Sequence, residues 1–195
     1  KIMMPLIGIF NIYNALAAIS FAKHVEISND KIRKALETLS PIKGRVEYVN
    51  KGQPFSVVVD YAHTPDSLEE LYKAFKNKRK ICVLGNTGGG RDKWKRPQMG
   101  AIAEKYCDTI ILTNEDPYDE NPRKIEDEMA DGMDRKPEVI MDRRKAIQKA
   151  LQKAKREDVV LITGKGTDPY IMEKNGKKTP WSDVKVVEEE LESLR

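Results

Sequence analysis

Four short polar segments of this 195-residue chain carry the side chains best suited to chemistry. They span residues 60–65, 85–92, 114–117 and 164–168, and each follows an apolar run. Their carboxylate, imidazole, guanidinium and ammonium groups can bind the charged groups of a small molecule. If the apolar runs are parallel strands, their carboxyl ends lie at one edge of a sheet, where such folds bind ligands. We therefore expect the four segments to form one site.

The second segment combines glycines with a dense group of cations. Four glycines lie between Gly85 and Gly90, and residues 91–97 read Arg-Asp-Lys-Trp-Lys-Arg-Pro. Glycines let backbone amides approach an anion, and the neighbouring cations favour a carboxylate or a phosphate. A plain glycine turn is the alternative. Neither this run nor residues 164–166 matches the Gly-Lys-Ser/Thr ending of a phosphate-binding P-loop, so a self-contained nucleotide-hydrolysing domain is not expected.

Alternating strand and helix patterns position these segments. The alternation predicts an α/β fold with a largely parallel sheet and helices on both faces. β-Branched apolar runs predict strands at residues 45–49, 56–60, 80–84, 109–113, 138–141 and 159–163. Helical periodicity predicts helices at residues 65–75, 96–105, 122–133, 143–155 and 184–194.

Two further helices are predicted before this pattern begins. They span residues 11–22 and 28–39, with Ser28 as the N-cap of the second. The helical pattern breaks at residues 41–45, where we place a domain boundary. Two helices alone bury little surface, so we expect them to pack against a further part of a larger protein. The start of the chain is accordingly expected to lie inside such a protein.

Composition narrows the function classes. The chain is 39% hydrophobic and 34% charged, and its net charge of +4 is dispersed, which argues against nucleic-acid binding. No apolar run reaches the roughly 18 residues of a membrane span, and no signal peptide is recognisable, so a cytoplasmic protein is expected. Cys82 and Cys107 lie in apolar stretches without metal-ligand spacing. They are predicted to be buried free thiols, with neither a disulfide nor a metal site.

Taken together, five ordered motifs resemble the signature of the Mur ligases. They are residues 10–18, 43–47, 59–65, 91–97 and 164–166, within a similarity that runs from about residue 5 to about residue 185. The resemblance is greatest to the members that add the third amino acid of the peptidoglycan stem peptide. It implies that residues 1–40 are the last helices of a central ATP-binding domain. Residues 41–195 would then be the Rossmann-like C-terminal domain.

The resemblance also implies a reaction. In this family a carboxylate accepts the γ-phosphoryl group of ATP, with Mg²⁺, and an amine then attacks the acyl phosphate to form an amide. The co-substrates would be UDP-N-acetylmuramoyl-dipeptide and a free amino acid. The family's phosphate-binding loop and magnesium-associated lysine precede the segment matched here, in the remaining N-terminal and central domains. The segment alone is therefore expected to be inactive.

For the nucleotide, the resemblance assigns five residues. Asn14 would lie near the adenine, Arg45 and Asp60 near the ribose, and His63 and Thr64 toward the phosphates. A carboxylate at a strand end can accept hydrogen bonds from two ribose hydroxyls, which gives the Asp60 assignment a physical reason.

For the incoming amino acid, the resemblance assigns Arg91, Glu115, Asp116, Tyr118, Gly164 and Asp168. Family members that use meso-diaminopimelate carry Asp-Asn-Pro-Arg where residues 115–118 read Glu-Asp-Pro-Tyr. They usually carry His-Glu where this chain has Thr167 and Asp168.

Losing the arginine's forked contact costs on the order of 1.5–3 kcal/mol of binding. The acids at 115, 116, 119 and 120 instead favour a basic amino acid such as lysine or ornithine, although a merely solvated acidic loop is the alternative.

Two other functions remain open at this point. The chain could belong to another ligase of the same superfamily, of the folylpolyglutamate or cyanophycin type. It could also act alone as a ligand-binding module without catalysis.

Overall fold

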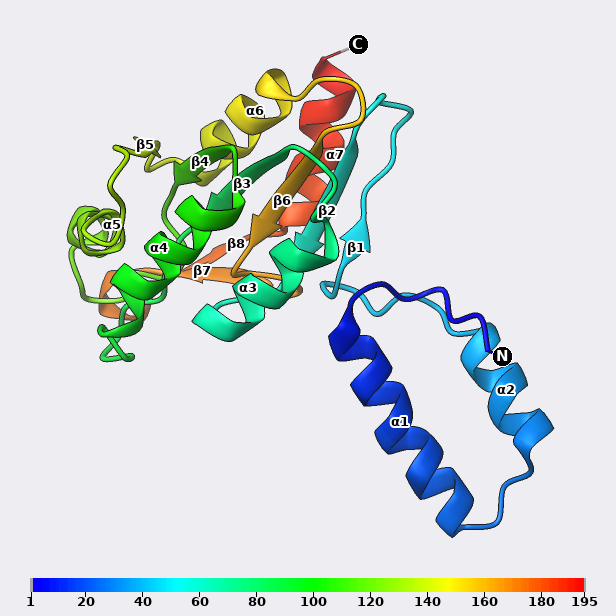
Figure 1. Ribbon diagram of the computed structural model, residues 1–195. Coiled ribbons are helices and arrows are strands. Elements are labelled where there is room, and N and C mark those ends of the chain that lie inside the picture. The colour runs from blue at the N-terminus through cyan, green and yellow to red at the C-terminus, as the bar shows by residue number, and fades with distance from the viewer. Residues whose placement is uncertain (1, 195) are drawn as a thin grey trace. The chain divides into compact units, whose positions relative to one another are not determined.

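The computed structural model describes residues 2–194, which form two compact units that divide between Ile42 and Lys43. In the first unit, α1 (Ile9–His24) is followed by α2 (Asn29–Glu37) (Figure 1). No residue of α1 is buried, and α2 buries only Ile32 and Leu36. The two helices thus bury little surface, as expected. Among residues 2–194, no helix is long and apolar enough to cross a membrane.

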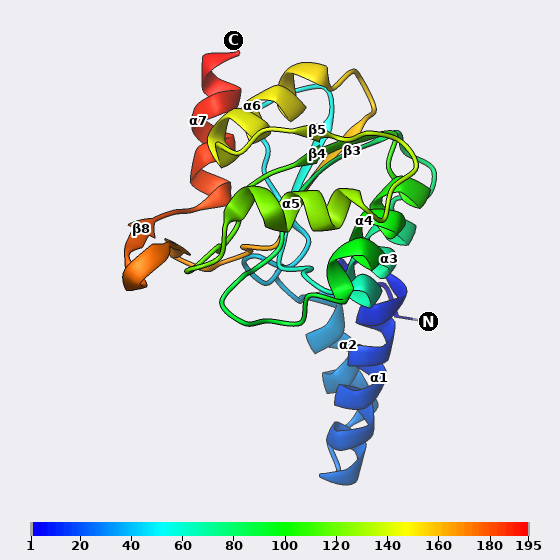
Figure 2. The same ribbon diagram turned by 90° about the vertical axis from the view of Figure 1, so that its left-hand side faces the viewer.

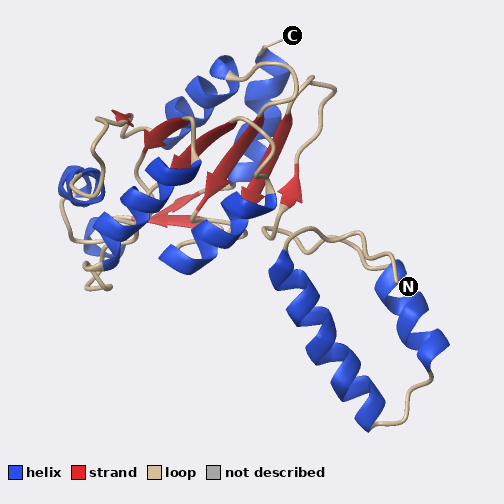
Figure 3. Ribbon diagram, in the orientation of Figure 1, coloured by secondary structure: helices blue, strands red, loops and turns tan. Residues whose placement is uncertain are grey.

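The second unit is built on a six-stranded sheet in the order β1-β2-β6-β3-β4-β5 (Figure 3). Its strands are β1 (Glu47–Tyr48), β2 (Ser56–Asp60), β3 (Lys80–Leu84), β4 (Thr109–Leu112), β5 (Glu138–Val139) and β6 (Val159–Thr163). All neighbouring strands are parallel except β1, which pairs antiparallel with β2. The predicted α/β class with a mostly parallel sheet is confirmed.

Helices cover both faces of this sheet (Figures 1 and 2). One face carries α3 (Pro65–Ala74) and α4 (Lys95–Tyr106), with α5 (Pro122–Ala130) beside α4, and the other carries α6 (Arg143–Lys153) and α7 (Asp183–Ser193). Because side chains alternate along a strand, every second strand residue enters the core under α6 and α7. That core includes Val57, Val59, Ile81, Val83, Ile111, Val160, Ile162, Ile147, Leu151 and Val187, all essentially inaccessible to solvent.

Local sequence explains where the helices begin. Thr64 caps α3 through a reciprocal pair of bonds with Ser67, and Pro65 occupies the first helical position. Asn121, Asp142 and Ser182 cap α5, α6 and α7 through their side chains. Ser28 is at the N-cap of α2 as predicted, although its side chain makes no capping hydrogen bond.

Some predicted elements end a few residues early, such as β5 at Val139 and not at residue 141, and α5 at Ala130 and not at residue 133. Two other details differ more from the sequence-based expectation. The first strand is only two residues long, because Gly44 and Val46 have positive φ angles of 65° and 46° that interrupt an extended backbone. A hairpin of β7 (Tyr170–Met172) and β8 (Lys178–Pro180) was not predicted. Its connection, the 3-10 turn η1 (Lys174–Gly176), gave no strand signal in the sequence.

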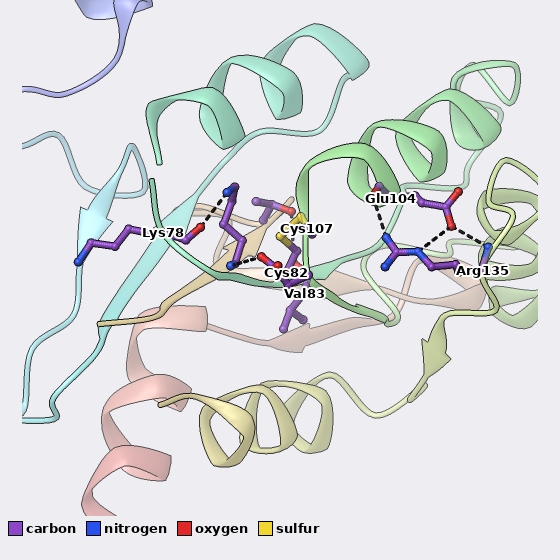
Figure 4. The surroundings of a disulfide bond; sticks show 9 residues. Lys78, Cys82, Val83, Glu104, Cys107 and Arg135 are labelled. Carbon is purple, nitrogen blue, oxygen red and sulfur yellow. Dashed lines mark hydrogen bonds and ion pairs between the residues drawn. A yellow bond between two sulfur atoms is a disulfide. The ribbon is translucent and has the colours of Figure 1, made fainter. Parts of the chain in front are cut away.

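The prediction that both cysteines are free thiols is wrong. Cys82 on β3 and Cys107 at the end of α4 form a disulfide, with their Cα atoms 6.2 Å apart (Figure 4). The reason is topological. Helix α4 packs on the sheet and ends immediately before β4, which is the strand that pairs with β3. Two residues distant in sequence are therefore neighbours, which local cysteine spacing cannot reveal.

Candidate functional site

The four polar segments meet at the carboxyl ends of the parallel strands. Residues from all four line one pocket of about 610 Å³. The lining consists of Tyr61, His63, Thr64, Pro65, Asp66, Thr87, Arg91, Asp92, Trp94, Lys95, Gln98, Glu115, Asp116, Tyr118, Gly164 and Asp168. The convergence expected from the sequence is therefore present in the structure.

The residues assigned by resemblance divide into three groups. Every residue assigned to the incoming amino acid lines the pocket, as do His63 and Thr64. Arg45 and Asp60 belong to the same unit but do not line it. Asn14 lies on α1, in the first unit, so its proximity to adenine stays a prediction.

Asp60, at the end of β2, stabilises the neighbouring backbone through its carboxylate. Its two carboxylate oxygens accept the backbone amides of Val46 and Ala62, each at 2.7 Å. Burial raises the pKa of Asp60, and these two amides act in the opposite direction. The carboxylate thus ties the turn at Gly44–Val46 to the sheet, which accounts for an aspartate here without a ligand. Its contact with a ribose stays a prediction.

Arg45 and His63 both contact Tyr61. The Arg45 guanidinium carbon lies 4.4 Å from the centroid of the Tyr61 ring, close enough for a cation–π interaction. The His63 ring packs edge-on against the same tyrosine, and its Nδ1 lies 2.7 Å from the Tyr61 carbonyl oxygen. Because Tyr61 lines the pocket, it links Arg45 to the site indirectly.

The glycines of the second segment serve close packing between loops. A methyl group at Gly85 would overlap the carbonyl oxygen of Thr113, and one at Gly88 would overlap that of Pro117. Gly89, with φ of 66°, packs directly against the Tyr118 ring. The glycine run therefore lets the second and third segments approach one another, and this accounts for three of its four glycines.

Sequence reasoning missed several pocket residues, of which Lys95 and Trp94 are the most informative. Both stand at the start of α4, within the cation-rich stretch where only Arg91 was assigned. Lys95 Nζ donates to the His63 carbonyl oxygen at 3.2 Å, and burial lowers the pKa of its ammonium group. Trp94 lines the pocket although its side chain is largely exposed. The proximity of these residues to the glycine run was the available signal.

The acids of the third segment are already engaged by protein groups. Glu115 is buried, its Oε1 accepts the Thr87 hydroxyl at 2.7 Å, and its Oε2 has no partner within residues 2–194. Burial raises the pKa of Glu115, while the Arg143 cation and the Thr87 hydroxyl act in the opposite direction. Asp116 accepts Lys165 Nζ on both oxygens, at 2.8 and 2.7 Å. Asp116 is thus engaged on both oxygens, whereas Glu115 keeps one oxygen without a protein partner at the pocket.

The remaining two acids are engaged as well. Glu120 is paired with Arg96 and Lys93, at 3.1 and 3.0 Å. Burial alone would raise the pKa of Glu120, but these hydrogen bonds outweigh burial and lower it to about 2. Asp119 accepts the Asn175 backbone amide at 2.9 Å. Three of the four acids are therefore engaged by protein groups, and the choice between a basic amino acid and diaminopimelate stays a prediction.

Among the residues assigned to the incoming amino acid, two opposite charges remain available in the pocket, which Asp66 and Asp92 also line without an ion pair within residues 2–194. Arg91 is exposed and forms no ion pair with any carboxylate of residues 2–194, and Asp168 lies 3.6 Å from Lys165 Nζ with its side chain 42% exposed. A free guanidinium and a partly free carboxylate suit a ligand that carries both a carboxylate and an ammonium group. Within the described residues no cluster of three His, Cys, Asp or Glu side chains could hold a metal ion.

Comparison with known proteins gives this pocket its context. The family profile described as Mur ligase, glutamate ligase domain, matches residues 44–166. A UDP-N-acetylmuramoyl-L-alanyl-D-glutamate--2,6-diaminopimelate ligase of Aquifex aeolicus is 46% identical over 188 residues, covering 94% of this chain and 38% of that protein. The ligase of the same name from Syntrophomonas wolfei is 46% identical over 181 residues, covering 89% of this chain and 37% of that protein. The chain thus spans well under half the length of these relatives.

Solved structures show the same fold. A ligase of the same name superimposes with a TM-score of 0.74 at 32% identity, over 99% of this chain and 40% of that one. A folylpolyglutamate synthase of Mycobacterium tuberculosis gives a TM-score of 0.64 at 19% identity, over 84% of this chain and 39% of that one, which shows likeness of fold alone. The family profile covers most of the second unit and includes residues from all four polar segments of the pocket. The chain belongs to the Mur ligase family.

Proposed function

We propose that the whole protein is an ATP-dependent ligase that joins an amino acid to UDP-N-acetylmuramoyl-dipeptide, and that the pocket binds the incoming amino acid. The carrying observation is that all six residues assigned to the amino acid line one pocket, in a chain up to 46% identical to ligases of that kind. Such a reaction consumes ATP and a nucleotide-linked precursor, which assigns it to the cytoplasm.

We further propose that the amino acid is 2,6-diaminopimelate. The relatives are named for it, and three of the four acids that would have selected a basic side chain are engaged by protein groups. Diaminopimelate carries a second carboxylate, and the uncommitted Arg91 can supply the cation for a carboxylate at the pocket rim. Lysine and ornithine lack that group and are the competing substrates.

In this proposal the chain's own residues bind the incoming amino acid and the nucleotide and orient them for reaction. Arg91 holds a carboxylate of the amino acid, and Asp168 holds an ammonium group, which aligns the other amine for attack. On the nucleotide side, Arg45 and His63 face the ribose and phosphates. Bound ATP with Mg²⁺ supplies the phosphoryl group that activates the acceptor carboxylate. The other domains of the whole protein supply the remaining contacts.

The test is the Arg91→Ala substitution in the full-length ligase. A lost charge-assisted contact of about 1.5–3 kcal/mol predicts a rise of roughly 10- to 150-fold in KM for diaminopimelate, with little change in KM for ATP. Lys93→Ala is the matched control, because Lys93 lies two residues away, pairs with Glu120 and does not line the pocket. Equal effects of the two substitutions, or faster turnover of lysine than of diaminopimelate by the unaltered enzyme, would refute the assignment.

A further inference from the structure

The Asp116 carboxylate is the meeting point of three parts of the second unit. It accepts Lys165 Nζ on both oxygens and also accepts the Met172 backbone amide at 2.8 Å. Asp116 is 6% exposed and Lys165 only 1% exposed. Lys165 comes from the segment after β6 and Met172 from the β7–β8 hairpin, so one side chain joins the third and fourth pocket segments to the hairpin.

The hairpin also binds the third segment through its backbone. The Tyr118 amide donates to the Met172 carbonyl oxygen at 3.0 Å, and the Asn175 amide donates to Asp119 at 2.9 Å. Together with the Asp116 bond, these contacts bind the third segment to the hairpin at residues 116, 118 and 119. Within residues 2–194 no other strand pairs with the hairpin, so these bonds connect it to the pocket wall.

The arrangement indicates a role for Lys165 that differs from phosphate binding. Its ammonium group is buried, and both oxygens of Asp116 lie within hydrogen-bonding distance. Its only other ion pair within residues 2–194 is with Asp168, at 3.6 Å. A buried lysine held in this way keeps two pocket segments at a fixed distance, whereas a ligand-binding lysine has to present its ammonium group to the pocket.

We propose that Asp116 and Lys165 are positioning residues, and that the β7–β8 hairpin acts with them to set affinity for the incoming amino acid. This inference rests on the proposed function of the pocket. A wall held in its binding geometry before the ligand arrives avoids the ordering cost of binding. Asp116 and Tyr118 line the pocket for the amino acid. Loosening residues 116–119 therefore weakens binding of the amino acid more than binding of ATP.

Three variants of the full-length ligase test this. Asp116→Asn keeps an acceptor for the Met172 amide but loses the charge opposite Lys165. Lys165→Met leaves Asp116 buried and without its cation. The double variant Asp116→Asn/Lys165→Met removes both charges together, which buried pairs tolerate better than the loss of one partner. It keeps the test valid if a single variant fails to fold.

The matched control is Lys78→Met. Lys78 belongs to the second unit but lies outside the pocket and the hairpin, and its exposed ammonium group pairs with Glu157. Each single pocket variant is expected to raise KM for diaminopimelate at least tenfold, with KM for ATP within about twofold of normal. The double variant is expected to be no worse than the worse single variant, because the two residues act as one unit. Lys78→Met is expected to leave both constants unchanged.

Two outcomes would overturn the inference. One is an unchanged KM for diaminopimelate in a folded Asp116→Asn variant. The other is an equal rise in KM for ATP and for the amino acid, since that would reflect general destabilisation. If the unaltered ligase neither binds nor consumes diaminopimelate, the proposed function itself has failed, and this result is distinct from both.

Discussion

Gly164 shows how narrowly individual residues define the pocket. It follows β6 with φ of 106°, a conformation that side chains with a Cβ rarely adopt, and a methyl group there would overlap the Glu115 carboxylate. Glycine is therefore required by both backbone conformation and space. Because Glu115 is buried against it, a change at Gly164 is transmitted directly to the third segment.

Gly164→Ala is predicted to weaken diaminopimelate binding at least tenfold and to destabilise the chain by about 1–3 kcal/mol through strain. Gly176→Ala is the control, because Gly176 also has a positive φ, of 70°, but an added methyl group would meet no atom within 4 Å. It is expected to lower stability slightly and leave affinity intact. Calorimetric titration and thermal unfolding measure the two effects. Normal affinity in Gly164→Ala would show that Glu115 does not shape the site.

The two tryptophans provide a second test at the residue scale. Trp94 is 64% exposed at the pocket, whereas Trp181 is partly buried and donates its Nε1 to Asp183 at 2.8 Å. Trp181→Phe leaves Trp94 as the only indole. Saturable change in its fluorescence is expected when diaminopimelate is added, while Trp94→Phe, which keeps Trp181, is expected to show none. A signal in the second variant alone would place the ligand elsewhere.

At the scale of elements, the disulfide closes the segment that carries one pocket wall. Cys82 and Cys107 are 25 residues apart, and between them lie the glycine run, Arg91 and α4. Arg135 further fixes α4 by donating to Glu104 (Figure 4). Both ends of this wall are thus anchored in the core.

Cys82→Ala/Cys107→Ala is predicted to lower the free energy of unfolding by about 3 kcal/mol, since a cross-link of this span restricts the unfolded chain. Denaturant unfolding with and without a thiol reductant measures this. The reductant should destabilise the natural chain and leave the double variant unchanged. If two reactive thiols are detected after the natural chain is unfolded without reductant, the disulfide between Cys82 and Cys107 is contradicted.

Helix α5 supplies a pH-dependent prediction. Glu126 is buried, its Oε2 has no hydrogen-bond partner among residues 2–194, and burial raises its pKa well above the usual range. Because the pKa of Glu126 is higher in the folded state, its contribution to stability is fully present when the pH is below the unfolded-state pKa of about 4.3. That contribution is lost as the pH rises through the folded-state pKa. Glu126→Gln is therefore expected to raise the Tm at pH 8 and to change it little at pH 4.

Glu128, on the same helix, is the matched control. It pairs with Arg96 at 2.6 Å, so Glu128→Gln is expected to lower the Tm at pH 8. Thermal unfolding followed by circular dichroism at both pH values measures the two variants. A lower Tm for Glu126→Gln at pH 8 would show that the carboxylate is charged and stabilised there.

The sequence predicted these elements to different degrees, for physical reasons. The buried parallel strands are continuous β-branched runs, so β2, β3 and β6 were located to the residue. The β7–β8 hairpin is short and rich in exposed lysine, which leaves no periodic pattern to read. The meeting of the four polar segments was predictable, because the carboxyl ends of parallel strands lie at one edge of a sheet. The Asp116–Lys165 pair joins residues 49 positions apart, and no local pattern reveals such a partner.

At the scale of the whole molecule, the pocket belongs entirely to the second unit, from Lys43 onward. The chain spans 38% of the length of the Aquifex aeolicus relative, so the proposed ligase reaction is assigned to the whole protein and not to this chain alone. Binding of the amino acid, by contrast, is proposed to depend on residues that the second unit already holds in place. The central claim can therefore be tested on this chain directly.

The most direct measurement is calorimetric titration of the purified chain with 2,6-diaminopimelate, L-lysine and L-ornithine, each with and without ATP. We predict saturable binding of diaminopimelate that exceeds binding of either basic amino acid and is weakened at least tenfold by Arg91→Ala. Preferential binding of lysine or ornithine, or diaminopimelate binding that does not depend on Arg91, would contradict the assignment of this pocket.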